Sequence, residues 1–519
     1  MFSRFLQILN SKPINKFNKF RKFSISNNVK SNAFFQNHSS IPTSKIIKSN
    51  QIVSRLGFGS YRINLKEIEY QNALEHAIKS GINVIDTSAN FESGESEEAI
   101  GSVLENMFKN ELVSREDLVV ISKAGYFETS NIESLDNSFA KVTNNSAHSI
   151  TPEFLMDQIN QSLKRLKLNK LDIFMLNNPE RMMQAKNKQY SINNLYNDIK
   201  HAFHYLDSEV TRGRIKGYGI CSNTMANPDA IDHISLPTIL ERLPESSKQN
   251  FIAVQVPFNL FERDAIQEFQ ESSLAQYAKF NDIFLFTNRP LYSITRGGIR
   301  PLVNTRNNDI SYERITNDLA DEFQIFTQLE TELNESYSVI DLKITSKFIW
   351  SQILSENLNK LSQNYFSTKY YIEKQVKPNI SNALELLSNF IVTNKLMENN
   401  EKLKNWITQY QLEVQKITNL IISYAYFNLL SMNNDLDSIL STISPSLLLD
   451  DDNKSQLYNS PLSVKALRIL LANSSIGCIL VGMRNINYVN DSILALKLSD
   501  DDFLTVESLK DIYNCSLLQ

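Results

Sequence analysis

Charged and amide side chains lie at the ends of several short apolar runs in this sequence. Asp86 belongs to the run 83–90, Lys123 to the run 118–126, and Asn177 to the run 171–179. A carboxylate beside an ammonium group serves acid–base chemistry when a proton-transferring group lies next to it. The same pair is costly to break as a buried ion pair even where nothing reacts. The residues alone leave both interpretations open.

Composition excludes several other classes of protein. The 519 residues carry 53 Lys and Arg against 57 Asp and Glu, so no basic excess is present to bind a nucleic acid backbone. Cys221, Cys478 and Cys515, with six scattered histidines, lack the spacing of a zinc site or of a disulfide framework. The sequence contains no run of about 18 apolar residues, so no membrane span is predicted. The length of 519 residues predicts two to four domains, and a hydrophobic content of 42% is enough to bury at least one full core.

The elements that position these side chains are eight β-rich runs, most of them followed by a helical pattern. Helical spacing is clearest over 70–79 and over 152–166. Repeated strand–helix units with continuous apolar strands predict an α/β fold, a (β/α)8 TIM barrel. The eight runs are 56–62, 83–90, 118–126, 171–179, 215–223, 251–260, 283–291 and 476–483.

A second region, different in composition, begins after the glycine at position 298. The residues from 299 to 476 contain no glycine, and apolar residues from Leu403 to Tyr424 repeat at steps of four and three. This pattern predicts three to five antiparallel helices, a large all-helical insertion over 302–461 between the seventh strand and its helix at 463–473. The seam is more typical of the core of a small bundle than of a partner-binding coiled coil. The insertion is a lid, a docking module or a decoration.

The first 66 residues contain no Asp or Glu, and basic residues recur through them. This composition is typical of a transit peptide, with an expected cleavage after Phe23 and import into the mitochondrial matrix. A disordered basic tail on a cytoplasmic protein is the alternative. The expected division of the chain is therefore 1–50 transit peptide and basic linker, 51–301 barrel with strands one to seven, 302–461 helical insertion, and 462–519 helix seven, strand eight and a C-terminal helix.

Short motifs in a common order give the chain a family resemblance. Along all eight strands the sequence resembles the aldo-keto reductase family, and the segment 51–301 is the reductase-like part of the barrel. The matching pieces are Leu56-Gly-Phe-Gly59, Gly81-Ile-Asn-Val-Ile-Asp-Thr-Ser88, Ser96-Glu97, Ser122-Lys123, Leu171-Asp-Ile-Phe-Met-Leu176, Gly217-Tyr-Gly-Ile-Cys-Ser-Asn223, Gln255, Pro290-Leu291 and Val481-Gly-Met-Arg484.

The resemblance implies an oxidoreductase that passes hydride from NADPH to a carbonyl group. The family uses a Tyr as proton donor, a Lys and an Asp that tune this Tyr, and a His that orients the carbonyl. Asp86 and Lys123 match. Phe91 occupies the position of the Tyr and has no proton to give, and Asn177 replaces the His with an amide that still donates a hydrogen bond.

The resemblance also implies a set of cofactor-binding residues. Ser222, Asn223 and Gln255 match the residues that hold the nicotinamide carboxamide. Arg484, after Gly482, matches the arginine that binds the 2′-phosphate of NADPH, since a guanidinium pairs well with a phosphate. Asn288 occupies the position of the aromatic residue that usually stacks on the nicotinamide ring.

Three hypotheses follow from the altered tetrad. The first is an NADPH-dependent oxidoreductase with a small-molecule carbonyl substrate and weak or altered activity. The second is a non-catalytic NADPH-binding barrel whose helices at 302–461 engage a protein partner. The third is a decayed barrel that serves only as a scaffold. Tyr61 and Tyr126 are the local phenols that remain to replace the missing proton donor.

Overall fold

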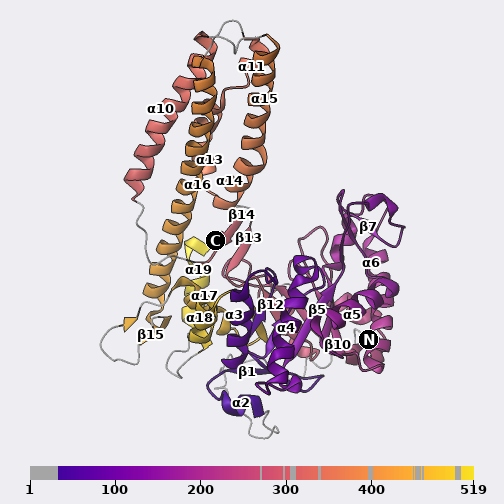
Figure 1. Ribbon diagram of the computed structural model, residues 1–519. Coiled ribbons are helices and arrows are strands. Elements are labelled where there is room, and N and C mark those ends of the chain that lie inside the picture. Colours follow the sequence, from indigo (N-terminus) through magenta and orange to yellow (C-terminus); the bar gives the residue numbers. More distant parts are fainter. Residues whose placement is uncertain are drawn as a thin grey trace.

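The eight apolar runs form parallel strands that close into a barrel (Figure 1). The computed structural model describes residues 33–268, 272–295, 298–303, 311–336, 340–394, 401–447, 449–450, 457–458, 461–496 and 504–518. Each predicted run contains one strand of the barrel, which confirms the predicted fold class. In chain order the strands are β3 (Leu56–Gly59), β4 (Val84–Asp86), β5 (Val119–Ala124), β9 (Leu171–Asn177), β10 (Ile215–Cys221), β11 (Phe251–Pro257), β12 (Phe284–Asn288) and β17 (Cys478–Gly482).

Helices connect the strands, as a parallel sheet requires. The two helices expected from spacing are present: α5 coincides with 152–166, and α3 begins two residues before the predicted start. Thr151 caps α5, since its hydroxyl accepts a hydrogen bond from the Phe154 amide. The helices around the barrel are α3 (Ile68–Lys79), α4 (Glu95–Lys109), α5 (Pro152–Leu166), α6 (Ile192–Thr211), α7 (Leu236–Arg242), α8 (Glu245–Asn250), α9 (Leu274–Phe280), α17 (Leu462–Leu471) and α18 (Ile486–Leu496).

Two apolar layers stabilise the barrel. Inward-facing residues such as Val84, Ile121 and Met175 form a cluster inside it, and a larger cluster lies between the strands and the helices. The strands approach closely where a side chain is missing. A Cβ on Gly219 would lie 2.2 Å from the carbonyl oxygen of Ala253 in the neighbouring strand.

Residues 33–50, expected to belong to a basic linker, are folded instead. They form the short helix α2 (Ala33–Asn37) and strand β1 (Thr43–Ile46), which pairs antiparallel with β2 (Gln51–Ser54). The hydrophobic effect stabilises this hairpin, because Ile46 and Val53 are buried in the interior cluster of the barrel. The expected cleavage site after Phe23 lies outside the described residues.

The segment between β12 and α17 contains helices together with short strand pairs. The pair of β13 (Tyr292–Thr295) and β14 (Gly298–Pro301) precedes the predicted insertion at 302–461, and the pair of β15 (Leu449–Asp450) and β16 (Leu457–Tyr458) lies within it. The helices of the insertion are α10 (Tyr312–Ser336), α11 (Leu342–Thr345), α12 (Trp350–Glu356), α13 (Leu358–Leu361), α14 (Tyr365–Tyr371), α15 (Lys377–Thr393) and α16 (Glu401–Ile443). Most members of the predicted seam are buried in a core of their own, namely Leu403, Tyr410, Val414, Ile417 and Ile421.

Helix α16 connects this core to the barrel. The insertion stands away from the barrel, and the C-terminal part of α16 returns to α17 and to the terminal helix α19 (Val506–Asn514) (Figure 1). There the buried Lys465 of α17 forms an ion pair with Asp437 of α16 at 2.9 Å. Breaking a buried pair of this kind is costly, so α16 is held firmly against the barrel.

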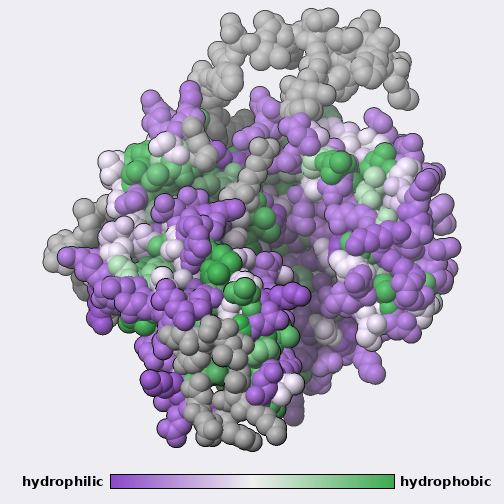
Figure 2. Space-filling model, turned by 90° about the horizontal axis from the view of Figure 1, so that it is seen from above, coloured by the Kyte–Doolittle hydropathy of each residue, from purple (hydrophilic) through white to green (hydrophobic). Residues whose placement is uncertain are grey.

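The molecular surface carries separate apolar patches on a mainly hydrophilic background. Seen from above, two lobes are divided by a hollow (Figure 2). Leu342 and Val392 of the insertion are among the large apolar side chains that are exposed. Within the described ranges, no helix combines the length and the apolar character needed to cross a membrane.

Candidate active site

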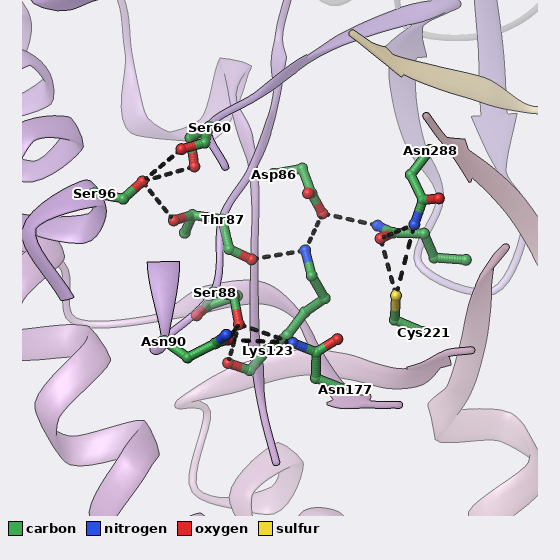
Figure 3. Close-up of polar contacts among 12 residues, drawn as sticks. Ser60, Asp86, Thr87, Ser88, Asn90, Ser96, Lys123, Asn177, Cys221 and Asn288 are labelled. Atoms are coloured by element: carbon green, nitrogen blue, oxygen red, sulfur yellow. Dashed lines mark hydrogen bonds and ion pairs between the residues drawn. The ribbon is translucent and has the colours of Figure 1, made fainter. Parts of the chain in front are cut away.

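A buried ion pair occupies the mouth of the barrel. Asp86 is the last residue of β4, and Lys123 lies near the end of the adjacent strand β5. The Lys123 ammonium donates to Asp86 Oδ1 at 2.5 Å and to the Thr87 carbonyl oxygen at 2.7 Å (Figure 3). Asp86 is 5% exposed and Lys123 is 1% exposed. The structure therefore brings together the two residues that match the family tetrad.

Phe91 lies against this pair, where the family has its proton donor. The Lys123 ammonium is 5.3 Å from the centre of the Phe91 ring, within the range of a cation–π contact. On another side the ring packs edge-to-face on Tyr61 at 5.2 Å. Phe91 begins a short turn in which Glu92 and Ser93 have positive φ values of 47° and 55°, a conformation costly for residues other than glycine. The apolar ring is thus held beside the ammonium by a strained loop.

Asn177, the replacement for the tetrad His, is bonded within its own network. Its amide donates to Ser88 Oγ at 3.2 Å and to Asn90 Oδ1 at 3.3 Å (Figure 3). Ser88 also lies 2.6 Å from Asn90 Oδ1 and 3.0 Å from the Lys123 carbonyl oxygen. These bonds fix Asn177 next to the strand that carries Lys123.

Gln255 and Asn288 extend the network on the other side of Asp86. Gln255 Nε2 donates to Asp86 Oδ1 at 2.8 Å, and its Oε1 accepts from Asn288 Nδ2 at 3.0 Å. The Cys221 thiol also lies 3.1 Å from Gln255 Oε1. Burial raises the pKa of this thiol to about 12, so it is neutral and behaves as the small core residue expected from its strand position. Gln255 is thus bound to Asp86.

Ser222 and Asn223 have different environments although they are neighbours. Ser222 Oγ accepts from the backbone amides of Thr224 and Met225 and so caps the loop after β10. Asn223 is exposed, and its side chain has no hydrogen bond within the described part of the chain. Only Asn223 therefore presents a free amide to a ligand.

A second polar cluster, not anticipated from the sequence, lies beside Asn177. The Tyr126 hydroxyl is 3.3 Å from Asn178 Oδ1, and Asn178 Nδ2 donates to Glu180 Oε1 at 3.0 Å. The backbone amide of Asn223 donates to the same oxygen at 2.8 Å. Glu180 is 3% exposed, and burial raises the pKa of its carboxyl. No sequence motif marks this cluster; its one signal is the two polar residues Asn178 and Glu180 directly after strand β9.

Gly482 and Arg484 lie at the end of β17, just before α18. A Cβ on Gly482 would meet no atom within 4 Å, so the backbone there faces open space. Among the described residues Arg484 has no ion pair, and its half-buried guanidinium stands close in sequence to the first turn of α18, where backbone amides favour anions. Across the described ranges, no group of His, Cys, Asp or Glu is arranged to bind a metal.

These observations test whether the residues fit a phosphorylated dinucleotide. Open space at Gly482 and the unpaired guanidinium of Arg484 suit the phosphate end. At the carboxamide end Asn223 is free, whereas Ser222 and Gln255 already have protein partners. The residues present fit the cofactor, but fewer side chains are free to bind its carboxamide than the sequence alone indicates.

Comparison with known proteins now identifies the family. The sequence model of the Aldo/keto reductase family matches residues 55–426, so this chain belongs to that family. The match ends inside α16, before β17.

Individual relatives are distant. This chain is similar to two proteins of Bacillus subtilis. It is 22% identical to the uncharacterized oxidoreductase YqkF over 42% of its length, and 22% identical to the aldo-keto reductase YhdN over 44% of its length. The chain spans about half the length of these curated relatives, 56% of each. The glycerol dehydrogenase AKR11B4 from Gluconobacter oxydans is 14% identical with a TM-score of 0.46, over 91% of this chain and 94% of that chain.

Proposed function

We propose that this protein is an NADPH-dependent oxidoreductase that reduces a small carbonyl compound, with weak or altered activity. The observation that carries the proposal is the buried Asp86–Lys123 pair at the ends of adjacent strands. A buried charge pair is expensive to maintain, and here it lies in the mouth of the barrel. In this family of barrels the C-terminal face is where chemistry takes place.

The cofactor end of the proposal rests on four residues. Arg484 would bind the 2′-phosphate of NADPH, and the open backbone at Gly482 would let the pyrophosphate approach. Asn223 would bind the nicotinamide carboxamide, joined by Gln255 if its amide leaves Asp86. NADPH, when bound, supplies the hydride.

The remaining residues decide how well the carbonyl is activated. Hydride addition leaves charge on the carbonyl oxygen, and this charge needs a hydrogen-bond donor and a proton. Lys123 contributes positive charge, and Asn177 contributes an amide that is already bonded to Ser88 and Asn90. Because Phe91 has no proton to donate, turnover is expected to be slower than with a phenol at that position.

The alternative is a non-catalytic barrel that binds NADPH and engages a protein partner through the helices at 302–461. The specific observation in its favour is the engagement of Gln255 by Asp86, next to the apolar ring of Phe91. A site that only binds the cofactor needs neither a proton donor nor a free Lys123.

A titration of the full chain with NADPH, followed by fluorescence, distinguishes these functions. A panel of aliphatic, aromatic and dicarbonyl substrates is then added to the saturated wild type, to Phe91→Tyr and to Lys123→Met. Turnover by the wild type that disappears in Lys123→Met supports the oxidoreductase. Binding with turnover only in Phe91→Tyr supports the alternative. Absence of binding at millimolar NADPH would exclude both and leave a scaffold.

We also propose a mitochondrial location, on the grounds of the acid-free, basic composition of residues 1–66. Fusion of residues 1–50 to a fluorescent protein tests it directly. Co-localisation with a matrix marker is expected, together with loss of about 23 residues. Diffuse cytoplasmic fluorescence of the uncut fusion would contradict the proposal.

A further inference from the structure

Tyr126 is a phenol that the barrel holds in a fixed orientation near the ion pair. It begins strand β6 (Tyr126–Glu128), three residues after Lys123. This strand pairs antiparallel with β8 (Ser146–His148), and Tyr126 lies opposite His148. Between Lys123 and Tyr126, a Cβ on Gly125 would collide with His148 Nε2 at 2.5 Å and with the Asn177 carbonyl oxygen at 2.6 Å. The chain thus turns tightly from Lys123 past the end of β9.

The ring of Tyr126 is held by two neighbours. The Arg181 guanidinium lies 4.6 Å from the ring centre, and the His148 ring packs edge-to-face at 5.0 Å. Arg181 is itself held by Ser146, because its Nη2 donates to Ser146 Oγ at 2.7 Å. Burial keeps His148 neutral by lowering its pKa to about 3, so Arg181 is the cation on this phenol.

The Tyr126 hydroxyl donates a hydrogen bond to Asn178 Oδ1 at 3.3 Å. Asn178 directly follows Asn177, whose amide donates to Ser88 and Asn90 at the end of β9. Tyr126 therefore places a phenolic donor beside the tetrad position on β9, and its O–H would turn from Asn178 to a substrate oxygen.

We propose that Tyr126 takes the role that position 91 has lost, donating a hydrogen bond and then a proton to the substrate oxygen. This inference rests on the proposed oxidoreductase function. Hydride from NADPH bonds to the carbonyl carbon, the π electrons of the C=O bond move to oxygen, and the Tyr126 O–H proton transfers to that oxygen. The resulting tyrosinate, stabilised by the Arg181 guanidinium, recovers its proton from water.

Two other phenols near the mouth suit this role less well. Tyr61 is 62% exposed and has no hydrogen bond to its hydroxyl within the described chain, so it is poorly oriented. Tyr292 lies on β13, after the end of β12, and its hydroxyl also lacks a hydrogen bond among the described residues. Precise placement matters, because proton transfer falls steeply when the donor is displaced by about 1 Å.

The pKa of Tyr126 determines how the proposed proton transfer would appear in kinetic measurements. Burial raises the pKa of Tyr126 to about 12, while the charge of Arg181 acts to lower it. A phenol of this pKa is protonated at neutral pH and is still more acidic than the alcohol that forms when the alkoxide takes its proton. Proton transfer would therefore be slow enough to contribute to the rate, and a solvent isotope effect on kcat should be visible.

The test compares Tyr126→Phe with the wild type in the full-length chain, on the carbonyl that the wild type reduces fastest. Tyr126→Phe keeps the ring contacts with Arg181 and His148 and removes only the hydroxyl. We expect kcat to fall at least about 100-fold and the solvent isotope effect to disappear, with an unchanged Kd for NADPH. Tyr370→Phe on α14 of the insertion, the same change at a side chain that is 64% exposed, should match the wild type.

The outcomes separate this inference from the function on which it rests. If Tyr126→Phe binds NADPH and retains wild-type kcat, the inference is wrong and the oxidoreductase stands. If Tyr61→Phe abolishes turnover and Tyr126→Phe does not, the donor is Tyr61. A wild type that binds NADPH and reduces nothing in the panel would overturn the proposed function and this inference with it.

Discussion

The Lys123 ammonium faces the Phe91 ring, with 5.3 Å between the nitrogen and the ring centre. A cation buried beside an aromatic ring is stabilised by the electrons of that ring. The contact keeps Lys123 in place but offers no proton to a substrate. The missing phenolic oxygen at Phe91 and the amide of Asn177 in place of the His therefore separate this arrangement from the tetrad of the family.

Restoring that atom gives the first prediction. Phe91→Tyr places a phenol against Lys123, whose charge would lower the pKa of the new hydroxyl. We expect kcat for small carbonyls to rise by about 10-fold, less than the roughly 100-fold of a first positioned acid, because Tyr126 already supplies a proton in the wild type. Steady-state kinetics checks it, and Phe91→Leu, which removes the ring and adds no acid, serves as the control. An unchanged or lower kcat in Phe91→Tyr would contradict it.

The second prediction concerns stability. Lys123→Met leaves Asp86 buried beside Gln255 with no cation, and removal of one partner of a buried pair costs about 3–5 kcal/mol. The free energy of unfolding, measured by urea denaturation, should fall by that amount. The double variant Asp86→Asn with Lys123→Met should recover part of the loss, because it removes both charges. Equal unfolding midpoints for wild type and Lys123→Met would show that the pair contributes nothing.

The third prediction tests the phosphate site. Arg484→Met should raise the Kd for NADPH by about 10- to 100-fold, since a charge-assisted pair with phosphate is lost. The Kd for NADH, which has no 2′-phosphate, should stay the same. Arg314→Met on α10, where the arginine is exposed, provides the control for loss of one positive charge. Equal weakening for both cofactors would place the contact elsewhere on the dinucleotide.

The fourth prediction is a pH dependence in the insertion. Burial and the neighbouring Glu413 carboxyl raise the pKa of Glu322 to about 7. Glu322 lies on α10 and Glu413 on α16, and Lys416 donates to Glu413 at 2.9 Å. Because the pKa is higher in the folded state, the stabilisation is full below the ordinary Glu pKa near 4.5 and is lost as pH rises through about 7.

Thermal unfolding between pH 5 and pH 8 measures this effect. The wild type should lose melting temperature over this interval. Glu322→Gln, which cannot ionise, should lose less. Glu332→Gln, a neighbouring change on α10, should behave like the wild type. A parallel pH dependence in all three proteins would show that Glu322 does not titrate in this range.

The barrel could be predicted because its signal is local. Each strand is an apolar run of the right length, and Asp86 and Lys123 occupy the ends of two such runs. The contact between them follows from topology, since the ends of adjacent parallel strands meet at one face of a barrel.

Other features depend on contacts distant in sequence and could not be predicted. The hairpin of β1 and β2 folds because Ile46 and Val53 enter the barrel interior, whereas composition marks residues 33–50 only as basic. The sequence predicts that Gln255 binds the cofactor, but its amide donates to Asp86, which lies 169 positions away in the chain. The cluster of Tyr126, Asn178, Glu180 and Asn223 likewise joins three segments that no motif connects.

The insertion also has a consequence for biosynthesis. Strand β17 completes the barrel by pairing with β12 and β3, but β12 ends at Asn288 and β17 begins at Cys478. At typical ribosomal rates of 5–20 residues per second, roughly 10–40 s pass between the two. Throughout that interval the edges of β12 and β3 lack a neighbour and are open to aggregation. Because the insertion has its own apolar core, it can collapse early and keep its two ends close, which shortens the loop that the last strand must close.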